Sequence, residues 1–536
     1  MSGQAGGLPA VIGVAGAGTM GAGIAQLAAT AGIRTLLFDP VPGAAERGAA
    51  RVLEGLEGAK ARGKLSVDDL RAAWERIEAV DTIAGLAPCE LVIEAAPEEP
   101  ELKRALYADL AATVSADCIL ASNTSSIPIT ALAADVPGPE RVVGMHFFNP
   151  APVMKLVEVI AGVTTSPRAL AVARATGAAM GRRVIDATDG PGFLVNRCGR
   201  PFGLEALRCV TEGLAEPHVV DRIARLGGRF RMGPFELQDL VGIDTGFAVS
   251  ESFYELSFGE PRWRPSPLSA RMVAGGRHGR KTGRGWYAYD DAGAIVREAD
   301  PPAPDPPAVP DGGMVVIAGD LQVADDLRAL AIEAGWDVRE PGDAAGEVPD
   351  LIVDCGGAPG DDPLQGGPVV LLCAEGSLAA LDGGGGAAGF HAIPPLVTGG
   401  LVELTRTTGT SPHSAERSER FFSSLGLHSA WVGDAPGLVL GRIVCQLVNE
   451  AAFAVGEGIG SPDDVDAGMV LGLNHPRGPL AWGDEIGLDH VLSVLDALHA
   501  ERGDPAYRAA PLLRELVLTG RLGVQTGQGF HEHADV

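Results

Sequence analysis

The chain repeats itself after 245 positions, and this internal duplication limits the folds it can adopt more than any other feature. The first-half residues that recur are Gly144, His146, Pro150, Glu158, Ser166, Pro167, Gly181, Asp189, Pro191, Gly192 and Arg197. Their counterparts are Gly389, His391, Pro395, Glu403, Ser411, Pro412, Gly426, Asp434, Pro436, Gly437 and Arg442, and the register continues through Asp239 and Asp484. This period is far longer than that of a solenoid repeat. We therefore expect two copies of one large folding unit.

A proline-rich segment, EADPPAPDPPAVPDGG at residues 298–313, separates the two copies. Its prolines remove backbone donors and disfavour helix, so it predicts a stiff, extended linker. At ~150 residues per domain, a chain of 536 residues can form three or four domains. The predicted domains are 1–187 and 188–297 in the first copy, and 314–432 and 433–536 in the second.

Within the first copy, residues 10–186 alternate between short apolar strands and helices. The expected strands are VIGVAG, RTLLFD, ELVIEA, DCILAS and RVVGMHFF, and MGAGIAQLAATAG is the helix between the first two. Such alternation predicts a parallel sheet with helices on both faces. From Gly192 to Tyr289 the pattern becomes helical, and the second copy repeats this order.

A glycine-rich turn follows the first expected strand. Gly16-Ala17-Gly18-Thr19-Met20-Gly21 has the G-x-G-x-x-G spacing, in which the glycines permit a tight turn, close approach of a pyrophosphate and helix–strand packing. Asp39 ends the second strand, where a carboxylate can accept a hydrogen bond from a ribose hydroxyl. Asp39 would also repel a 2′-phosphate, which favours NAD over NADP. The simpler alternatives are a tight strand–helix turn and an ordinary turn acid.

These patterns together predict the fold class. It is α/β, with a Rossmann-type doubly wound sheet plus an all-helical domain. The pair is duplicated, and the second Rossmann domain is degenerate.

Composition excludes several other classes of protein. The formal net charge of −27 disfavours nucleic acid as a partner. The seven cysteines form no CxxC pair, so we expect small buried side chains in a reducing compartment, and no metal is predicted. The first residues lack a basic signal-peptide start, and no apolar run of ~18 residues suggests a membrane span. A cytoplasmic enzyme is the expectation.

His146 and Glu158 are the candidate reacting groups. His146 lies near the carboxyl end of an expected strand, the edge where open α/β sheets bind ligands. Glu158 lies in the next apolar run, LVEVI, where an unpaired carboxylate is unfavourable and His146 is a plausible partner. Alcohol oxidation needs a base of this kind, oriented by a neighbour. From the pattern alone, a structural histidine fits equally well.

Five segments, in order and spacing, resemble the L-3-hydroxyacyl-CoA dehydrogenase family. They are GAGTMGAGIAQ, SNTSSIPIT, HFFNPAPVMKLVEVI, DGPGFLVNR and GRKTGRGWY, and they lie between Val11 and Tyr289. Weaker similarity covers the second copy, as in the long bacterial dehydrogenases with a repeated C-terminal domain, including those of phenylacetate breakdown. The resemblance implies oxidation of the 3-hydroxyl of an acyl-CoA with NAD.

The resemblance also implies roles for individual residues. His146 would be the general base and Glu158 its partner, while Ser125 and Asn196 would bind around the reacting oxygen and the thioester. The glycine-rich turn, Asp39, Glu98, Lys103, Asn123, Asn149 and Lys281 would contact NAD. Without the family, Ser125, Asn149 and Asn196 could cap helices or turns, and the lysines could be solvated charges.

CoA recognition is assigned to a helical arm. In the family, an arm inserted after the second strand meets the CoA, and here it would span residues 44–79. Lys60, Arg62 and Lys64 cluster at its turn, and we choose Lys60 as the candidate contact for the CoA phosphates. A solvated helix face explains these residues equally well.

The second copy has lost most of these features. Leu321 and Ala324 replace Gly18 and Gly21, Pro394 replaces Asn149, and Gly441 replaces Asn196, while a long segment that includes the arm is missing. Ser377, His391 and Glu403 remain. We expect a catalytically silent sheet domain in which His391 and Glu403 form a satisfied ion pair.

The family pairs through its helical domains, so the chain would form a homodimer or an intrachain pseudodimer. Two other functions stay open: a dehydrogenase of free 3-hydroxy sugar acids, and a non-catalytic nucleotide-binding protein. Neither the acyl chain length nor a terminal carboxylate on it follows from the sequence.

Overall fold

In the computed structural model, which describes residues 7–310, 313–343, 347–356 and 367–533, the chain forms two compact units. The first contains Met1–Arg197 together with Gly458–Leu473, and the second contains Cys198–Glu457 and Asn474–Val536. The division does not follow chain order, because a short segment of the second copy belongs with the first sheet.

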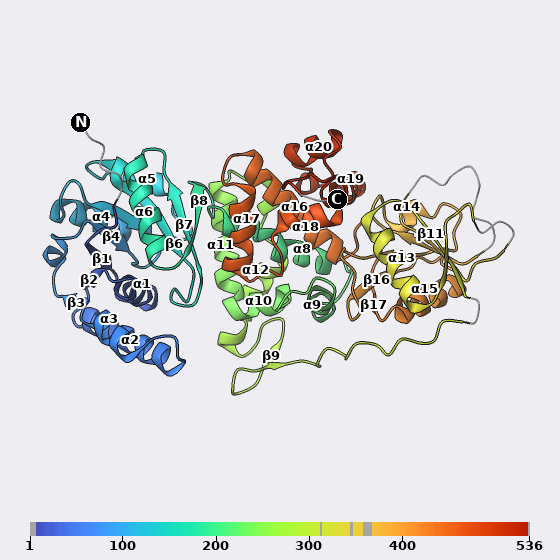
Figure 1. The fold of residues 1–536 in the computed structure, drawn as a ribbon, viewed down its shortest axis with the longest axis horizontal. Coiled ribbons are helices and arrows are strands. Elements are labelled where there is room, and N and C mark those ends of the chain that lie inside the picture. The colour runs from blue at the N-terminus through green and yellow to red at the C-terminus, as the bar shows by residue number, and fades with distance from the viewer. Residues whose placement is uncertain (1–6, 311–312, 344–346, 357–366, 534–536) are drawn as a thin grey trace. The chain divides into compact units, whose positions relative to one another are not determined.

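The first unit is built on an eight-stranded sheet in the order β3-β2-β1-β4-β5-β6-β7-β8 (Figure 1). All neighbouring strands are parallel except β6 and β7. The strands are β1 Val11–Ala15, β2 Arg34–Phe38, β3 Ile77–Val80, β4 Leu91–Glu94, β5 Ile119–Ser122, β6 Val142–Phe147, β7 Leu156–Ala161 and β8 Arg183–Thr188. The helices are α1 Thr19–Thr30, α2 Ala44–Ala61, α3 Val67–Trp74, α4 Pro100–Thr113, α5 Ile129–Ala133, α6 Pro167–Ala179, α7 Val195–Cys198 and α17 Pro462–Leu473. This confirms the predicted doubly wound sheet and the helical arm, and it adds β3, β7 and β8 to the five predicted strands.

The second unit contains a smaller sheet of the same topology, in the order β12-β11-β13-β14-β15-β16-β17. Its strands are β11 Met314–Ala318, β12 Asp337–Arg339, β13 Leu351–Asp354, β14 Val369–Leu372, β15 Ala388–His391, β16 Leu401–Thr405 and β17 His428–Trp431. The helices of this sheet domain are α13 Gln322–Ala334, α14 Leu378–Leu381 and α15 Pro412–Ser424. Within the described residues it has no counterpart of α2, α3 and β3, because the segment that forms them is missing from the second copy.

The helical domains of both copies lie mainly in the second unit. From the first copy come α8 Arg200–Thr211, α9 Pro217–Leu226, α10 Pro234–Val241, α11 Ile243–Leu256 and α12 Pro267–Ala274, followed by a short hairpin of β9 Ala288–Tyr289 and β10 Ile295–Val296. From the second copy come α16 Leu440–Gly456, α18 Pro479–Ile486, α19 Leu488–Arg502 and α20 Pro511–Leu518.

Two of the recurring residues, an aspartate and a serine that open helices, make the same hydrogen bonds in both copies. Asp189 accepts hydrogen bonds from the backbone N–H groups that open α5, and Asp434 does the same for α14. Ser166 and Ser411 cap α6 and α15, each followed by a proline in the first turn. These positions persist because a buried backbone donor needs an acceptor whether or not the domain is catalytic.

Helices α8 and α16, which occupy equivalent positions in the two copies, pack against each other in the second unit. The guanidinium of Arg442 on α16 is fully buried and donates to Glu205 at 2.7 Å and to Glu212 at 2.7 Å. Tyr507 also donates to Glu205, at 3.0 Å. A buried ion pair of this kind is stable only when both partners are present.

The two copies exchange helices at the edges of their sheets. Helix α17 of the second copy packs on β7 and β8, and α9 of the first copy packs on β16 and β17. The backbone N–H of Thr188 donates to Ile459 at 3.0 Å, and that of Gly433 donates to Leu214 at 2.8 Å. These two bonds are equivalent: the shift of 245 positions relates Thr188 to Gly433 and Leu214 to Ile459. Each bond joins the sheet domain of one copy to the helical domain of the other. Each sheet is therefore completed by the helical domain of the opposite copy.

The linker contains no helix or strand from Glu298 to Pro310, as expected, and residues 311 and 312 lie outside the described residues. Arg225 binds the carboxylate of Asp300 through two hydrogen bonds of 2.7 Å, which attaches the start of the linker to α9.

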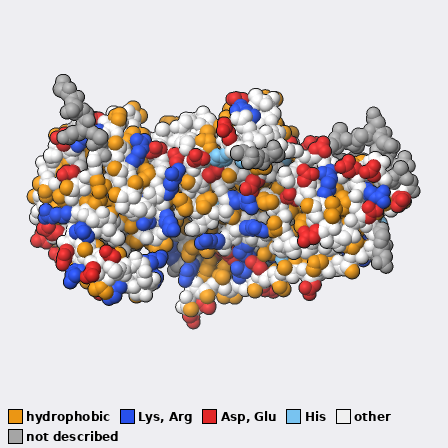
Figure 2. Space-filling model, in the orientation of Figure 1, with side chains coloured by type: hydrophobic (Ala, Val, Ile, Leu, Met, Phe, Trp, Pro, Cys, Tyr) orange, Lys and Arg blue, Asp and Glu red, His pale blue; other side chains and the backbone are white. Residues whose placement is uncertain are grey.

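Three expectations from the composition can be compared with the structure: membrane spans, surface charge and the state of the cysteines. None of the helices in the described part of the chain is long and apolar enough to span a bilayer. Figure 2 shows acidic side chains distributed over one face among basic and apolar ones. All seven cysteines are buried and form no disulfide among the described residues, as the sequence predicted.

Replacing Arg442 with Met should destabilise the pairing of the helical domains by about 3 kcal/mol, because Glu205 would stay buried without its main partner. Urea unfolding followed by circular dichroism measures the change. Arg514→Met is the matched control, since Arg514 pairs with Asp496 on the surface of the same domain, where the two side chains are 45% and 43% exposed. Such a pair contributes less than about 1 kcal/mol. Equal effects of the two substitutions would contradict the assignment of Arg442.

Candidate active site

The glycine-rich turn joins β1 to α1 and leaves space for a dinucleotide. Gly16 has a φ of +113°, and a Cβ there would collide with the backbone of Ala95. A Cβ at Gly21 would collide with the carbonyl oxygen of Gly16, so the third glycine brings helix and turn together. A Cβ at Gly18, by contrast, would meet nothing within 4 Å. The open side of the turn is where a pyrophosphate approaches in this motif.

Asp39 follows β2 beside this turn. Its carboxylate accepts hydrogen bonds from the backbone N–H groups of Ala17 at 2.8 Å and Val41 at 3.0 Å. These bonds hold the acid at the turn, where its remaining lone pairs can accept from a ribose hydroxyl. The geometry of the turn and its acid therefore fits NAD.

A buried ion pair that the sequence analysis missed lies at the end of β4. Glu94 is fully buried and accepts from the ammonium of Lys103 at 2.7 Å, from the Ser122 hydroxyl at 2.6 Å and from the Ala96 N–H at 2.7 Å. Lys103 is 1% exposed, so it is not the solvated charge that the sequence left open. The available signal was an acid closing an apolar strand shortly before a lysine on the next helix.

Lys103 also orders Glu98, which lies on the loop before α4 at 3.1 Å from the lysine. The Glu98 carboxylate accepts from the Thr124 hydroxyl at 2.6 Å and from the Ser125 N–H at 2.9 Å. Burial alone would raise the pKa of Glu98, but the charge of Lys103 and these hydrogen bonds lower it. Glu98 is thus held as an anion that fixes the loop carrying Ser125.

His146 and Glu158 face each other on the antiparallel strands β6 and β7. The Nδ1 atom of His146 lies 2.6 Å from a Glu158 oxygen, and the other oxygen accepts from the N–H groups of Leu194 at 3.1 Å and Val195 at 3.0 Å. Both side chains are buried, and the ring of Phe148 packs on the imidazole with centroids 4.5 Å apart. With Nδ1 engaged, Nε2 is the nitrogen that can take a proton from a substrate.

The other predicted residues of the first copy follow the carboxyl ends of the same strands. Asn123 follows β5 and accepts from the Phe147 N–H at 2.8 Å, which joins β5 to β6 beyond the end of their pairing. Asn149 lies just after β6 and is exposed. Asn196 lies on the short helix α7, next to the backbone groups that bind Glu158.

The two predicted basic contacts lie elsewhere. Lys60 is exposed in the last turn of α2, at the tip of the arm. Lys281 belongs to the second compact unit, where its half-exposed ammonium pairs with Asp244 at 2.6 Å. Within the described residues no cluster of three or more His, Cys, Asp or Glu side chains is arranged to hold a metal ion.

Comparison with known proteins agrees with this geometry. The family model described as "3-hydroxyacyl-CoA dehydrogenase, NAD binding domain" matches residues 11–190, and the one described as "3-hydroxyacyl-CoA dehydrogenase, C-terminal domain" matches residues 192–289 and 437–533. The chain belongs to the 3-hydroxyacyl-CoA dehydrogenase family. Its NAD-binding domain is the first sheet.

Two relatives and one solved structure place the chain within the family. It is 35% identical to the 3-hydroxyadipyl-CoA dehydrogenase of Escherichia coli, over 95% of this chain and 97% of the relative. It is 41% identical to a probable 3-hydroxybutyryl-CoA dehydrogenase of Bacillus subtilis, over 52% of this chain and 96% of the relative. The crystal structure of an Escherichia coli 3-hydroxybutyryl-CoA dehydrogenase matches with a TM-score of 0.81 and 33% identity, over 95% of this chain and 98% of that one.

The second copy of this dehydrogenase keeps the residues of the pair but not their contact, so the predicted His391–Glu403 ion pair is wrong. Glu403 accepts from the N–H groups of Val439 at 2.8 Å and Leu440 at 2.9 Å, as Glu158 does from its own loop. His391 instead places Nε2 3.1 Å from Nε2 of His490, and its Nδ1 has no partner among the described residues. Burial raises the pKa of Glu403 to about 8 and lowers that of His391.

The change at residue 441 explains the displaced imidazole. Gly441 stands where the first copy has Asn196, and a Cβ at this position would collide with the His391 ring. The ring therefore fills the space that a side chain would occupy. At the turn of this copy, Leu321 begins α13 with its side chain beside Gly356, where a cofactor would need bare backbone.

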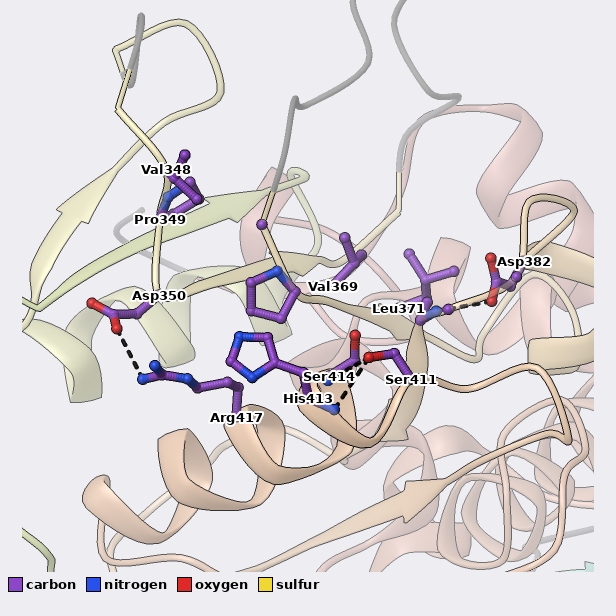
Figure 3. A pocket seen from close by; sticks show the side chains of 15 residues that line it. Val348, Pro349, Asp350, Val369, Leu371, Asp382, Ser411, His413, Ser414 and Arg417 are labelled. Atoms are coloured by element: carbon purple, nitrogen blue, oxygen red, sulfur yellow. Dashed lines mark hydrogen bonds and ion pairs between the residues drawn. The ribbon is translucent and has the colours of Figure 1, made fainter.

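The second sheet domain has a cavity of about 670 Å³, which lies at the amino ends of its strands. Figure 3 shows Asp350 and Arg417 paired across it, 2.9 Å apart, with Ser411 and His413 at the start of α15. Asp350 and Val369 lie at the amino ends of β13 and β14. Ligands of open α/β sheets bind at the carboxyl ends, so this cavity is not a relic of the cofactor site.

Replacing Gly18 with Leu should abolish NAD binding and leave the fold intact. The backbone at Gly18 has an ordinary φ of −68° and open space beside it, so a side chain fits the apoprotein but blocks the pyrophosphate. We expect a loss of NAD affinity of at least about 100-fold by isothermal titration calorimetry, with an unchanged melting temperature. Gly21→Ala, which collides with Gly16, should instead lower the melting temperature. Normal NAD affinity of Gly18→Leu would refute the assigned cofactor site.

His490→Leu should make the protein less sensitive to acid. Burial lowers the pKa of His490 from its ordinary 6.5 to about 4, so the unfolded chain binds the extra proton in this interval. The contribution of His490 to the free energy of unfolding is therefore fully present above pH 6.5. It decreases as the pH drops, by roughly 2 kcal/mol between pH 6.5 and pH 5. Urea unfolding at these two pH values should show a smaller loss in the variant. Parallel losses in variant and parent would rule out this role of His490.

Proposed function

We propose that this dehydrogenase oxidises the 3-hydroxyl of an L-3-hydroxyacyl-CoA to the 3-oxo thioester, with His146 as general base and Glu158 as its partner. The observation that carries the proposal is the 2.6 Å contact between His146 Nδ1 and a carboxylate that two backbone N–H groups also hold. A base must be presented in one tautomer and one orientation, and this arrangement does both.

The chain's own residues account for the proton. Glu158 accepts a hydrogen bond from the Nδ1–H of the neutral imidazole, which leaves the Nε2 lone pair to take the proton of the substrate hydroxyl. As that proton arrives, the imidazolium gains an ion pair with Glu158 in a buried site, where the interaction is stronger than in water. Bound NAD would accept the hydride from C3 of the substrate. Phe148, packed on the ring, keeps bulk water from one face of the imidazole.

The remaining predicted residues are proposed for binding. Ser125 and Asn196 would contact the reacting oxygen and the thioester, and Glu98 holds Ser125 in place for this. The glycine-rich turn, Asp39, Asn123, Asn149 and Lys281 would contact NAD, and Lys60 would contact the phosphates of CoA. Lys103 would act through Glu98, because its ammonium is buried between two carboxylates.

The second copy is proposed to be catalytically silent and structural. Its turn carries Leu321, and its histidine faces His490 in place of a carboxylate. The packing of α8 on α16 would be the intrachain equivalent of a dimer interface between separate subunits. A cytoplasmic enzyme, with its cysteines reduced, fits this proposal.

His146→Ala should lower kcat about 1,000-fold with little change in NAD affinity, because only the proton acceptor is lost. The assay follows NADH consumption with acetoacetyl-CoA. Glu158→Gln should lose a smaller factor, because the imidazole keeps its position but not the ion pair.

The second copy provides the matched control. His391→Ala removes the equivalent histidine and should leave the specific activity of the folded protein unchanged. A parent enzyme that ignores acetoacetyl-CoA but oxidises gulonate would identify a sugar-acid dehydrogenase. Turnover of neither, with intact NAD binding, would favour a non-catalytic nucleotide-binding protein.

A further inference from the structure

The helical domain of the first copy encloses a small cavity between α8, α10 and α11. Its volume is about 140 Å³, and its walls include the apolar side chains of Leu204, Leu207 and Leu237. At ~30 Å³ per water molecule in the liquid, it has room for the end of a chain of a few heavy atoms. Three kinds of polar group also reach it: a guanidinium, an amide and several serine hydroxyls.

The guanidinium is that of Arg200, on which no carboxylate acts in the part of the chain that the structure describes. It lies over the ring of Phe253, 4.4 Å from the centroid, and one terminal nitrogen is 3.4 Å from the Ser250 hydroxyl. Its Nε atom is inaccessible and donates to no described residue. Burial lowers the pKa of Arg200 to about 10, with no opposing acid nearby. A buried cation of this kind is costly unless an anion joins it.

The amide is that of Gln238 on α10. Its oxygen accepts from the Trp286 indole at 3.3 Å, which fixes the orientation of the side chain. The amide nitrogen is buried and, like Arg200 Nε, finds no acceptor among the described residues. Arg200 and Gln238 thus line one cavity, and each keeps a buried N–H that no described residue accepts.

The second copy lacks both donors. At the equivalent positions, Cys445 replaces Arg200 and Gly483 replaces Gln238. Val448 stands where the first copy has Gly203, and together with Leu488 it packs against Gly483. In the first copy, Gly203 leaves the corresponding space beside Gln238 without a side chain.

We infer that this cavity binds the terminal carboxylate of a dicarboxylic 3-hydroxyacyl thioester, with Arg200 and Gln238 as its donors. The inference rests on the proposed function. Apolar walls suit the methylene groups of the acyl chain, and a guanidinium with an amide suits a carboxylate at its end. A CoA diphosphate would bring more charge than two donors and three leucines accommodate.

Arg200 and the candidate substrate residue Asn196 are close in the sequence, so chain connectivity alone keeps their Cα atoms within ~14 Å of each other. The names of the relatives include both a dicarboxylic and a monocarboxylic acyl group, and Arg200 is the residue we assign to that choice.

The test compares two six-carbon substrates, 3-hydroxyadipyl-CoA and 3-hydroxyhexanoyl-CoA, which differ in the terminal carboxylate. The full-length parent enzyme should prefer the adipyl substrate about 100-fold in kcat/KM. Arg200→Met should lose this factor for the adipyl substrate and stay within about threefold for the hexanoyl substrate. Its melting temperature should be unchanged or higher, because an unpaired buried cation is removed. Arg271→Met, which removes an exposed arginine from α12, is the control and should change neither rate.

Gly203→Val is the second variant, because it copies the packing of the silent repeat. It should lower kcat/KM for both six-carbon substrates and spare 3-hydroxybutyryl-CoA, whose acyl chain is too short to reach the cavity. The inference is overturned if the parent shows no preference for the adipyl substrate, or if Arg200→Met reduces both rates equally. A parent that oxidises none of the three thioesters would instead refute the proposed function itself.

Discussion

The buried carboxylate of Glu158 is the constraint on which the rest of the first sheet domain depends. It is fully buried, so each of its oxygens must be satisfied by the protein. One oxygen binds the imidazole of His146, and the other binds two backbone N–H groups at the start of α7. A single side chain therefore joins β6, β7 and the start of α7, and it sets the position of His146 as part of holding the fold together.

In the second copy, the glutamate keeps its backbone hydrogen bonds but loses its contact with the histidine. Glu403 retains its two backbone hydrogen bonds, which the fold needs to begin α16. His391 lies in the space above Gly441 and contacts His490, because residue 441 has no side chain to fill that space. The same residues at the same spacing thus have a different geometry once their neighbours have changed.

The parts that were predictable from the sequence depend on local patterns. Five strands of the first sheet and the glycine-rich turn follow from apolar runs and glycine spacing. The contact of His146 with Glu158 was expected because a carboxylate in an apolar run needs a partner. The Glu94–Lys103 ion pair was missed because nothing local shows that a lysine on an amphipathic helix points inward. The exchange of α9 and α17, the His391–His490 contact and the cavity at Arg200 depend on residues far apart in the chain, whose proximity only the tertiary structure reveals.

The exchange of α17 has a consequence for how this enzyme responds to dilution. Gly472 on α17 lets the helix approach Leu156 and Phe148 closely, and Phe148 packs on His146. In a dimer of separate chains, the packing of α17 on Leu156 and Phe148 would be lost whenever the subunits dissociated. Here α17 belongs to the same chain as the sheet on which it packs. Its effective concentration is therefore set by the length of the polypeptide and not by the amount of protein present. The surroundings of His146 therefore do not depend on the protein concentration.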